Sequence, residues 1–171
     1  MSIPGGALQI RKLVADDVRR IWVLNESATP GVGRITEEGV ERLLGYSALA
    51  LGAFDGDTLL GFVLCLSPQT DYSSLNYRWF CERYSDFLYV DRIAVATDFR
   101  SQRIGALLYE QVFAYAEERS LTVMAEINLD PPNPGSVRFH ERHGFVRVGR
   151  LQHPSYLVAM YCRAKAESAG D

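Results

Sequence analysis

The residues best able to bind a charged ligand lie where an apolar run gives way to a helical pattern. The run ends at Val95, and Arg100, Arg103 and Gly105 follow just before an amphipathic stretch. Backbone N–H groups at the start of a helix lack partners within the helix, and the helix dipole places partial positive charge there. A phosphate group accepts hydrogen bonds from these N–H groups and is attracted by the partial positive charge, and a glycine lets the backbone come close to the phosphate. The spacing therefore predicts an anion site at residues 100–106.

This loop differs from two common nucleotide-binding loops. It lacks the Gly-Lys-Ser/Thr ending of a nucleotide P-loop, and it lacks the three spaced glycines of a dinucleotide-binding turn. A strand, turn and helix with one glycine also occurs in many α/β proteins without a ligand. The segment alone therefore does not decide whether an anion binds here.

Residues 95–108 are similar to the acetyl-CoA-binding motif of the GNAT superfamily of acetyltransferases, a strand followed by R/Q-x-x-G-x-G/A. Arg100 takes the first position, Gly105 the second glycine and Ala106 the position after it. Arg103 stands where the first glycine is usual, and it fits there if its side chain points outward and its φ is negative. The resemblance implies acetyl-CoA as cofactor. The contacts it implies come from Ile93, Ala94, Val95, Arg100, Ser101, Gln102, Arg103, Ile104, Gly105 and Ala106.

A second segment, residues 133–145, resembles the family signature N-x-x-A/S-x-x-x-Y-x-x-x-G-F. Asn133 and Ser136 match it, as do the closing glycine and phenylalanine, and His140 stands where tyrosine is usual. The asparagine-proline elbow and the histidine are also shared with a bacterial subgroup of predicted acetyltransferases. The resemblance covers residues 8 to about 163. It implies cofactor contacts from Asn133, Ser136 and His140.

The resemblance implies direct attack of an amine on the acetyl thioester. That reaction needs a neutral amine, a polarised carbonyl and a proton for the leaving thiolate. In this family, backbone N–H groups polarise the carbonyl, which points here to Ile93 through Val95. His140 is the candidate acid, because an unperturbed imidazole titrates near ~6.5. A histidine that only packs against the cofactor or caps a carbonyl fits the position equally well.

Asp91 and Glu126 are the candidate general bases, and Tyr89 accompanies them as a candidate catalytic residue. Period-two alternation places Tyr89 and Asp91 on one face of the predicted strand. Glu126 lies on the next predicted strand. Each also has a structural explanation, since Asp91 can pair with an arginine, Glu126 can face solvent and Tyr89 can pack in the core. The sequence leaves the choice open.

The acceptor amine is expected to bind at the parts of the chain that vary most between such enzymes. These are the loop at residues 25–35 and the aromatic segment at residues 72–84. The candidate substrate-binding residues are Glu26, Trp79, Phe80 and Tyr84. A long connection in a compact domain is often functional. The same aromatic residues also fit a short helix that packs on the core, and Glu26 also fits a solvated surface.

Periodicity and turn signals predict the elements that position these residues. Strands are expected at residues 8–13, 48–54, 58–66, 87–95, 121–128, 145–151 and 155–162, and helices at residues 16–24, 36–44, 101–120 and before Gly144. An Asp-Gly turn at residues 55–57 predicts a hairpin. The order predicts an α/β protein of α+β type, with a mixed, mostly antiparallel sheet of about seven strands and about four helices. One domain is expected over residues 1–171, with a core at about 8–163 and a frayed tail at 164–171.

Composition sets the broad limits. The chain has 171 residues, a net charge of −3 and 47% apolar residues, which is typical of a soluble single domain. Its basic residues are dispersed, so neither nucleic acid nor a membrane is expected as a partner. No signal peptide or apolar span of ~20 residues is apparent, and a cytoplasmic location is the default. Three unpaired cysteines and a weak His140/His143 pair predict neither a disulfide framework nor a metal site.

The expected partner is therefore a small-molecule or peptide amine, and a homodimer is possible by analogy with the family. Two other functions stay open. The departures at Arg103 and His140 are compatible with a non-catalytic acyl-CoA-binding or sensing domain. A wider channel beside the thioester would instead suit transfer of a longer acyl group.

Overall fold

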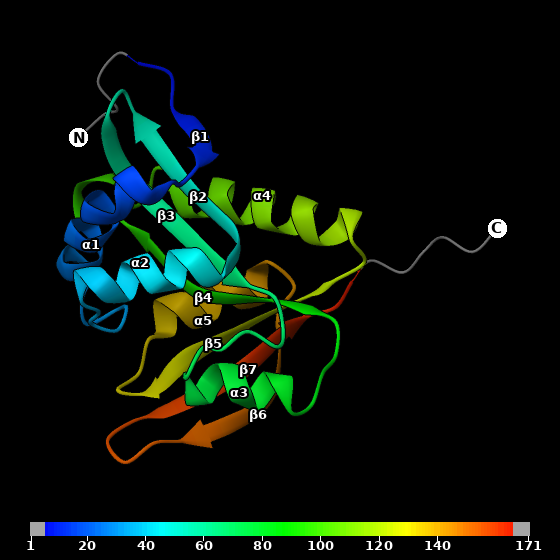
Figure 1. The fold of residues 1–171 in the computed structure, drawn as a ribbon. Helices are drawn as coiled ribbons and strands as arrows, with labels where there is room; N and C mark the ends of the chain where they lie inside the picture. The colour runs from blue at the N-terminus through cyan, green and yellow to red at the C-terminus, as the bar shows by residue number, and fades with distance from the viewer. Residues whose placement is uncertain (1–5, 166–171) are drawn as a thin grey trace. The chain divides into compact units, whose positions relative to one another are not determined.

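The computed structural model describes residues 6–165 (Figure 1). Within them, seven strands form one sheet in the order β1-β2-β3-β4-β5-β7-β6. The strands are β1 (Gln9–Lys12), β2 (Ser47–Asp55), β3 (Thr58–Leu66), β4 (Phe87–Val95), β5 (Thr122–Asp130), β6 (Val146–Gln152) and β7 (Leu157–Arg163). The helices are α1 (Val18–Ser27), α2 (Glu37–Tyr46), α3 (Leu75–Cys81), α4 (Ile104–Glu118) and α5 (Pro134–Arg142). The sheet is mixed as predicted, because β4 and β5 run parallel while the hairpin pairs run antiparallel.

The described chain divides into two compact units. The first unit holds residues 6–66, 70–72 and 90–113, and the second holds residues 67–69, 73–89 and 114–165. Strand β4 and helix α4 contribute to both. The prediction of one domain over residues 1–171 stays a prediction. Of the tail expected to fray, residues 166–171 lie outside the described range.

In the first unit, β2 and β3 form the predicted hairpin. Asp55 pairs with Thr58 across the turn, where Gly56 has a φ of +56°. This left-handed conformation is the one that a tight hairpin turn needs. Strand β3 is buried along nearly its whole length, which explains its continuous apolar run. Helices α1 and α2 pack on β2 and β3 (Figure 1).

In the second unit, β5, β7 and β6 are antiparallel neighbours, and the start of β4 pairs with β5. Helix α3 belongs here and makes five helices where about four were expected. Its Phe80 packs on Phe87 and Tyr89, with ring centroids 6.2 and 5.7 Å apart. A Cβ added to Gly149 of β6 would lie 2.6 Å from Cζ2 of Trp79, so only glycine admits the indole there. Residues 75–81 of the aromatic segment therefore fold as a helix that packs on strands of this unit.

The helix caps follow local sequence chemistry. The side chain of Thr36 accepts a hydrogen bond from the N–H of Gly39 at 3.0 Å and starts α2 as predicted. Helix α4 begins at Ile104, three residues later than expected, because Ser101 and Arg103 adopt left-handed backbone. Among residues 6–165, no helix has the length and apolar character that crossing a bilayer requires.

Candidate active site

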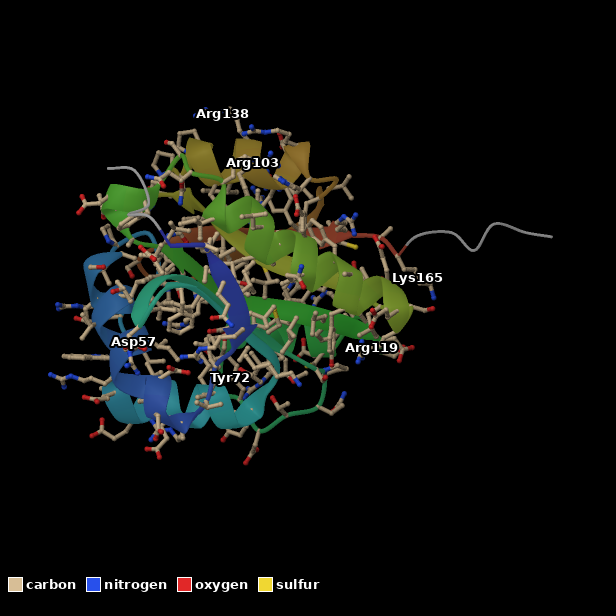
Figure 2. All side chains as sticks on the ribbon, turned by 90° about the horizontal axis from the view of Figure 1, so that it is seen from above. Asp57, Tyr72, Arg103, Arg119, Arg138 and Lys165 are labelled. Atoms are coloured by element: carbon tan, nitrogen blue, oxygen red, sulfur yellow. The ribbon has the colours of Figure 1, made fainter. Side chains whose placement is uncertain are left out.

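The loop at residues 96–103 has two residues in left-handed backbone just before helix α4. Ser101 and Arg103 have φ values of +71° and +62°, one on each side of Gln102 (Figure 2 shows Arg103 at the start of α4). In turns of this kind, successive N–H groups point toward a common centre and form a concavity that binds anions. Helix α4 then begins at Ile104 and adds the amides of its first turn. The predicted anion site therefore has a backbone suited to it.

Close packing holds the base of this loop. A Cβ on Gly61 of β3 would lie 2.9 Å from Cγ2 of Ile104 and 3.1 Å from the carbonyl oxygen of Ala94. The N–H of Ala96 donates to the carbonyl of Leu60 at 2.8 Å. The end of β4 and the start of α4 are thus tied to β3, which fixes where the loop begins and ends.

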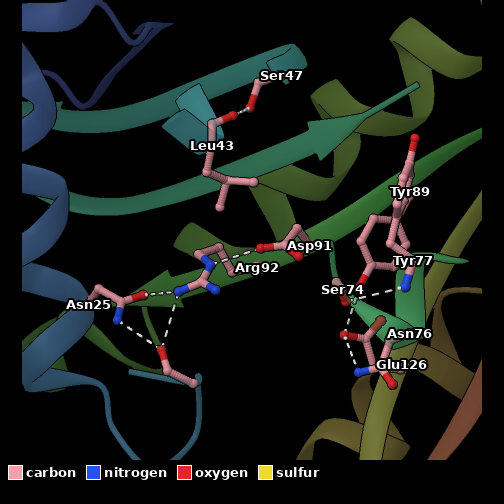
Figure 3. Close-up of polar contacts among 11 residues, drawn as sticks. Asn25, Leu43, Ser47, Ser74, Asn76, Tyr77, Tyr89, Asp91, Arg92 and Glu126 are labelled. Atoms are coloured by element: carbon pink, nitrogen blue, oxygen red, sulfur yellow. Dashed lines mark hydrogen bonds and ion pairs between the residues drawn. The ribbon is translucent and has the colours of Figure 1, made fainter. Parts of the chain in front are cut away.

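Glu126 of β5 is held inside the second unit by two donors (Figure 3). The hydroxyl of Tyr89 donates to Oε1 at 2.8 Å, and Nδ2 of Asn76 donates to the same oxygen at 3.2 Å. Tyr89 is fully buried. Nε2 of His153 lies 2.8 Å from Oδ1 of Asn76. Glu126 is therefore an oriented, half-buried carboxylate.

His140 of α5 is buried and tied to its own helix. Its Nδ1 lies 2.8 Å from the carbonyl oxygen of Ser136 and 3.3 Å from the Ser136 hydroxyl. Because a carbonyl only accepts, Nδ1 carries the proton, and Nε2 is the acceptor of the neutral ring. Burial lowers the pKa of His140, and the Ser136 carbonyl only partly offsets that effect. An acid role requires the imidazolium form, which this environment disfavours.

A buried ion pair occupies β4 in the first unit (Figure 3). Nε of Arg92 donates to Oδ2 of Asp91 at 2.9 Å, and the two side chains are 11% and 4% exposed. Burial opposes the charge of Arg92, but the Asp91 carboxylate, with a smaller contribution from Tyr72, outweighs it and keeps the pKa of Arg92 above its ordinary value. Nη1 of Arg92 also donates to Oδ1 of Asn25 at 2.9 Å and to the carbonyl of Gly33 at 3.2 Å. Asp91 is thus engaged as the counterion of an arginine that holds the loop after α1.

Sequence comparison supplies the deciding observation. A model of the acetyltransferase (GNAT) family matches residues 17–145 of the chain. The chain belongs to the GNAT acetyltransferase family. No curated protein sequence matches it.

Solved GNAT structures share its fold at low identity. A ribosomal-protein-S18-alanine N-acetyltransferase from Escherichia coli is 15% identical with a TM-score of 0.74, covering 96% of this chain and 99% of that one. Ard1 from Thermoplasma volcanium is 17% identical with a TM-score of 0.77, covering 94% and 99%. NAA60 from Arabidopsis thaliana, solved with a bisubstrate analogue, is 17% identical with a TM-score of 0.73, covering 91% and 97%. At these identities the likeness concerns the fold.

The second GNAT motif builds helix α5. Oδ1 of Asn133 accepts from the N–H of Ser136 at 3.2 Å and caps the helix. Gly144, with a φ of +87°, ends it. Phe145 is buried with its ring centroid 5.1 Å from that of His140. These residues have clear structural roles, and the cofactor contacts expected of Asn133, Ser136 and His140 stay predictions.

Arg103 departs from the expectation of a negative φ. Its side chain does point outward, being 78% exposed, and Nη2 lies 3.8 Å from Oε1 of Glu110. Its backbone, however, takes the left-handed conformation that the family's usual glycine adopts freely, at a cost of about 1 to 2 kcal/mol for an L-residue. The loop therefore places an L-residue in a backbone conformation that glycine adopts without a steric penalty.

Replacing Arg103 by glycine should give a more stable protein than replacing it by alanine, by about 1 kcal/mol. Both variants lose the same charged side chain, but only alanine keeps a Cβ in the left-handed region. Urea unfolding of the two variants measures the difference. Equal midpoints would mean that residue 103 does not keep a positive φ in solution.

The four candidate acceptor-binding residues lie in different surroundings. Glu26, in the last turn of α1, pairs with Arg34 of the loop that follows at 3.3 Å. Trp79 lies under the guanidinium of Arg83, whose Cζ is 4.1 Å from the ring centroid. Phe80 is fully buried, and Tyr84 lies beside it with ring centroids 6.4 Å apart. The burial of Phe80 favours core packing over acceptor binding, while the acceptor roles of all four residues stay predictions.

Four residues that make the contacts around Glu126 and around the Arg92 ion pair were not singled out as candidates from the sequence. Asn76 and His153 lie far along the chain from Glu126, and Asn25 and Arg92 lie 67 positions apart. No local pattern links them, because their contacts form only when the strands and helices pack. The one sequence signal that linked Tyr89 and Glu126 was their position on two consecutive predicted strands.

Proposed function

We propose that this GNAT chain transfers an acetyl group from acetyl-CoA to a primary amine of a small molecule or peptide by direct attack. The observation that carries the proposal is the half-buried Glu126 carboxylate, which two donors hold in a fixed orientation. A general base has to be oriented before its substrate arrives, and a preorganised carboxylate meets that need. Asp91 is the weaker candidate for the base, because Arg92 already engages it.

The backbone of residues 101–106 would hold the diphosphate of acetyl-CoA. The fit rests on the left-handed residues Ser101 and Arg103 and on the first-turn amides of α4, which together offer N–H donors without requiring a lysine. Arg100 and Arg103 would add positive charge beside it. When bound, acetyl-CoA supplies the acetyl thioester that the amine attacks. The backbone N–H groups of residues 93–95 are proposed to polarise its carbonyl.

In the proposed reaction, Glu126 takes the proton that the attacking nitrogen loses. A nitrogen–carbon bond forms, the carbon–sulfur bond breaks, and the sulfur keeps the bonding electrons. The released thiolate would then take up a proton from solvent. A free thiol titrates near ~8.5, so the thiolate is a fair leaving group even without an acid. Protonation by His140 stays a proposal, since it needs a second proton on a ring whose pKa is lowered by burial.

Acetyl-CoA should raise the melting temperature of the protein by about 5 to 10 °C at a concentration 100 times its dissociation constant. Binding at that ratio stabilises a fold by about 2.7 kcal/mol, and 1 kcal/mol corresponds to about 2 to 4 °C for a chain of this size. A thermal-shift titration measures it. Acetyl-pantetheine, which lacks the diphosphate and nucleotide, is the control and should act only at far higher concentration. No shift with acetyl-CoA, or equal potency of the fragment, would contradict the proposed cofactor site.

A further inference from the structure

We propose that Asn76 and His153 are positioning residues that orient the Glu126 carboxylate. His153 fixes which way the Asn76 side-chain amide points, and the amide in turn directs the carboxylate. The inference rests on the proposed role of Glu126 as general base. It concerns three residues of the second unit, each from a different element or turn: α3, β5 and the turn between β6 and β7.

The atoms determine the direction of each hydrogen bond. An ionised carboxylate only accepts, so Asn76 must present Nδ2 to Oε1 of Glu126, at 3.2 Å. Oδ1 of the same amide then faces Nε2 of His153 at 2.8 Å. Because an amide oxygen only accepts, Nε2 of His153 carries a proton. A flipped amide would lose both bonds, so the His153 donor selects the orientation that serves Glu126.

His153 is itself held firmly. It is 6% exposed, and its ring stacks on Tyr156 with centroids 4.1 Å apart and an interplanar angle of 10°. Its backbone N–H donates to the carbonyl of Tyr156 at 2.8 Å. The imidazole therefore has little freedom to rotate away from Asn76.

The helix that carries Asn76 is also fixed. The Ser74 side chain accepts from the N–H of Tyr77 at 3.3 Å and caps α3. The hydroxyl of Tyr77 donates to the carbonyl of Ser67 at 2.7 Å, and its ring centroid lies 5.4 Å from that of Tyr89. Asn76 and Tyr89 thus approach Oε1 of Glu126 from two elements that also contact each other.

This arrangement orients the carboxylate but does not conduct protons. A carboxamide has no proton that titrates near neutral pH, so a proton on Glu126 cannot pass through Asn76 to His153. Both donors converge on Oε1, which sets the plane of the carboxylate and hence the direction of Oε2. The register partner of Glu126 on β7 is Met160, which brings no competing charge.

The test follows the Glu126 carboxyl signal by NMR in the full-length chain, with 13C label in the glutamate carboxyl groups. The signal is assigned by its loss in Glu126→Gln. We expect its titration midpoint to rise by about one pH unit in Asn76→Leu, because a carboxylate that loses a hydrogen-bond donor protonates more readily. In His153→Phe, which keeps a ring but loses the donor, we expect a smaller rise of about half a unit.

Two further variants show whether the effect on Glu126 comes from the lost hydrogen-bond donor of His153 or from a general change in the structure. His153→Gln restores an N–H donor and should return the midpoint to within a few tenths of a unit of the unaltered protein. His143→Phe removes another histidine of the second unit, whose Nδ1 lies 2.7 Å from the carbonyl of Phe139, and should leave the midpoint unchanged. If His153→Phe does not fold, 15N NMR of the unaltered protein decides, since the inference requires the tautomer with a proton on Nε2. The other tautomer would overturn it.

The failure of this inference can be told apart from the failure of the proposed function. If Glu126→Gln abolishes turnover of acetyl-CoA with an amine panel, but Asn76→Leu and His153→Phe leave the midpoint unmoved, the positioning inference is overturned and the base assignment stands. If the midpoint responds as expected but Glu126→Gln keeps full turnover, the coupling is supported and the proposed role of Glu126 fails.

Discussion

Replacing Glu126 by glutamine should lower the turnover number by about 100- to 1,000-fold, while the KM for acetyl-CoA stays within about twofold. Glutamine keeps the shape of the side chain and an oxygen that accepts from Tyr89 and Asn76. It cannot take up a proton near neutral pH, and general base catalysis contributes about this factor. Thiol release from acetyl-CoA in the presence of an amine measures both constants.

The control for this experiment is Glu141→Gln. Glu141 lies in the same unit on α5 but is exposed, so its replacement should leave turnover unchanged. If the Glu126→Gln protein keeps full turnover, a group other than Glu126 must be the general base. A protein in which KM rises while the turnover number is preserved would mean that Glu126 binds substrate without acting on its proton.

Replacing Arg92 by leucine should lower the free energy of unfolding by about 3 to 5 kcal/mol. The change leaves the carboxylate of Asp91, 4% exposed, buried without its counterion, which is the costly way to break an ion pair. Oδ1 of Asn25 and the carbonyl of Gly33 lose a donor at the same time. Urea unfolding, followed by far-ultraviolet circular dichroism, measures the loss.

Two further variants test that explanation. Arg34→Leu removes an arginine that is 81% exposed and pairs with Glu26, so it should cost less than about 1 kcal/mol. Adding Asp91→Asn to Arg92→Leu removes the unpaired charge and should recover a large part of the lost stability. If Arg92→Leu is no more harmful than Arg34→Leu, the buried pair does not hold the first unit together.

Much of the fold could be predicted because its signals are local. The Asp-Gly turn at Gly56, the helix start at Thr36 and the terminating glycine at Gly144 each depend on a few neighbouring residues, and all three are confirmed. Strand β4 was predicted with its observed bounds, Phe87–Val95. Helix α3 was harder to predict, since a seven-residue helix shows barely two turns of periodicity and its aromatic residues suit a loop as well.

The parts that could not be predicted depend on contacts between distant segments. The positive φ of Arg103 could not be predicted, because nothing in the arginine itself favours left-handed backbone. Asn76 lies 50 positions from Glu126 and 77 from His153, so no spacing rule connects them. The two candidate bases also looked alike in sequence. Only their partners separate them: Asp91 faces an arginine, whereas Glu126 faces neutral donors.

Acetyl transfer itself is tested most directly by counting, in one reaction, the thiol released from acetyl-CoA and the amide formed on an amine. The amines are polyamines, amino acids, aminoglycosides and peptides with free N-termini. We expect mass spectrometry to find one acetylated amine for each thiol released. Thiol that appears with acetate and no amide, or acetyl-CoA that binds and stays intact with every amine, would contradict the assignment as an N-acetyltransferase.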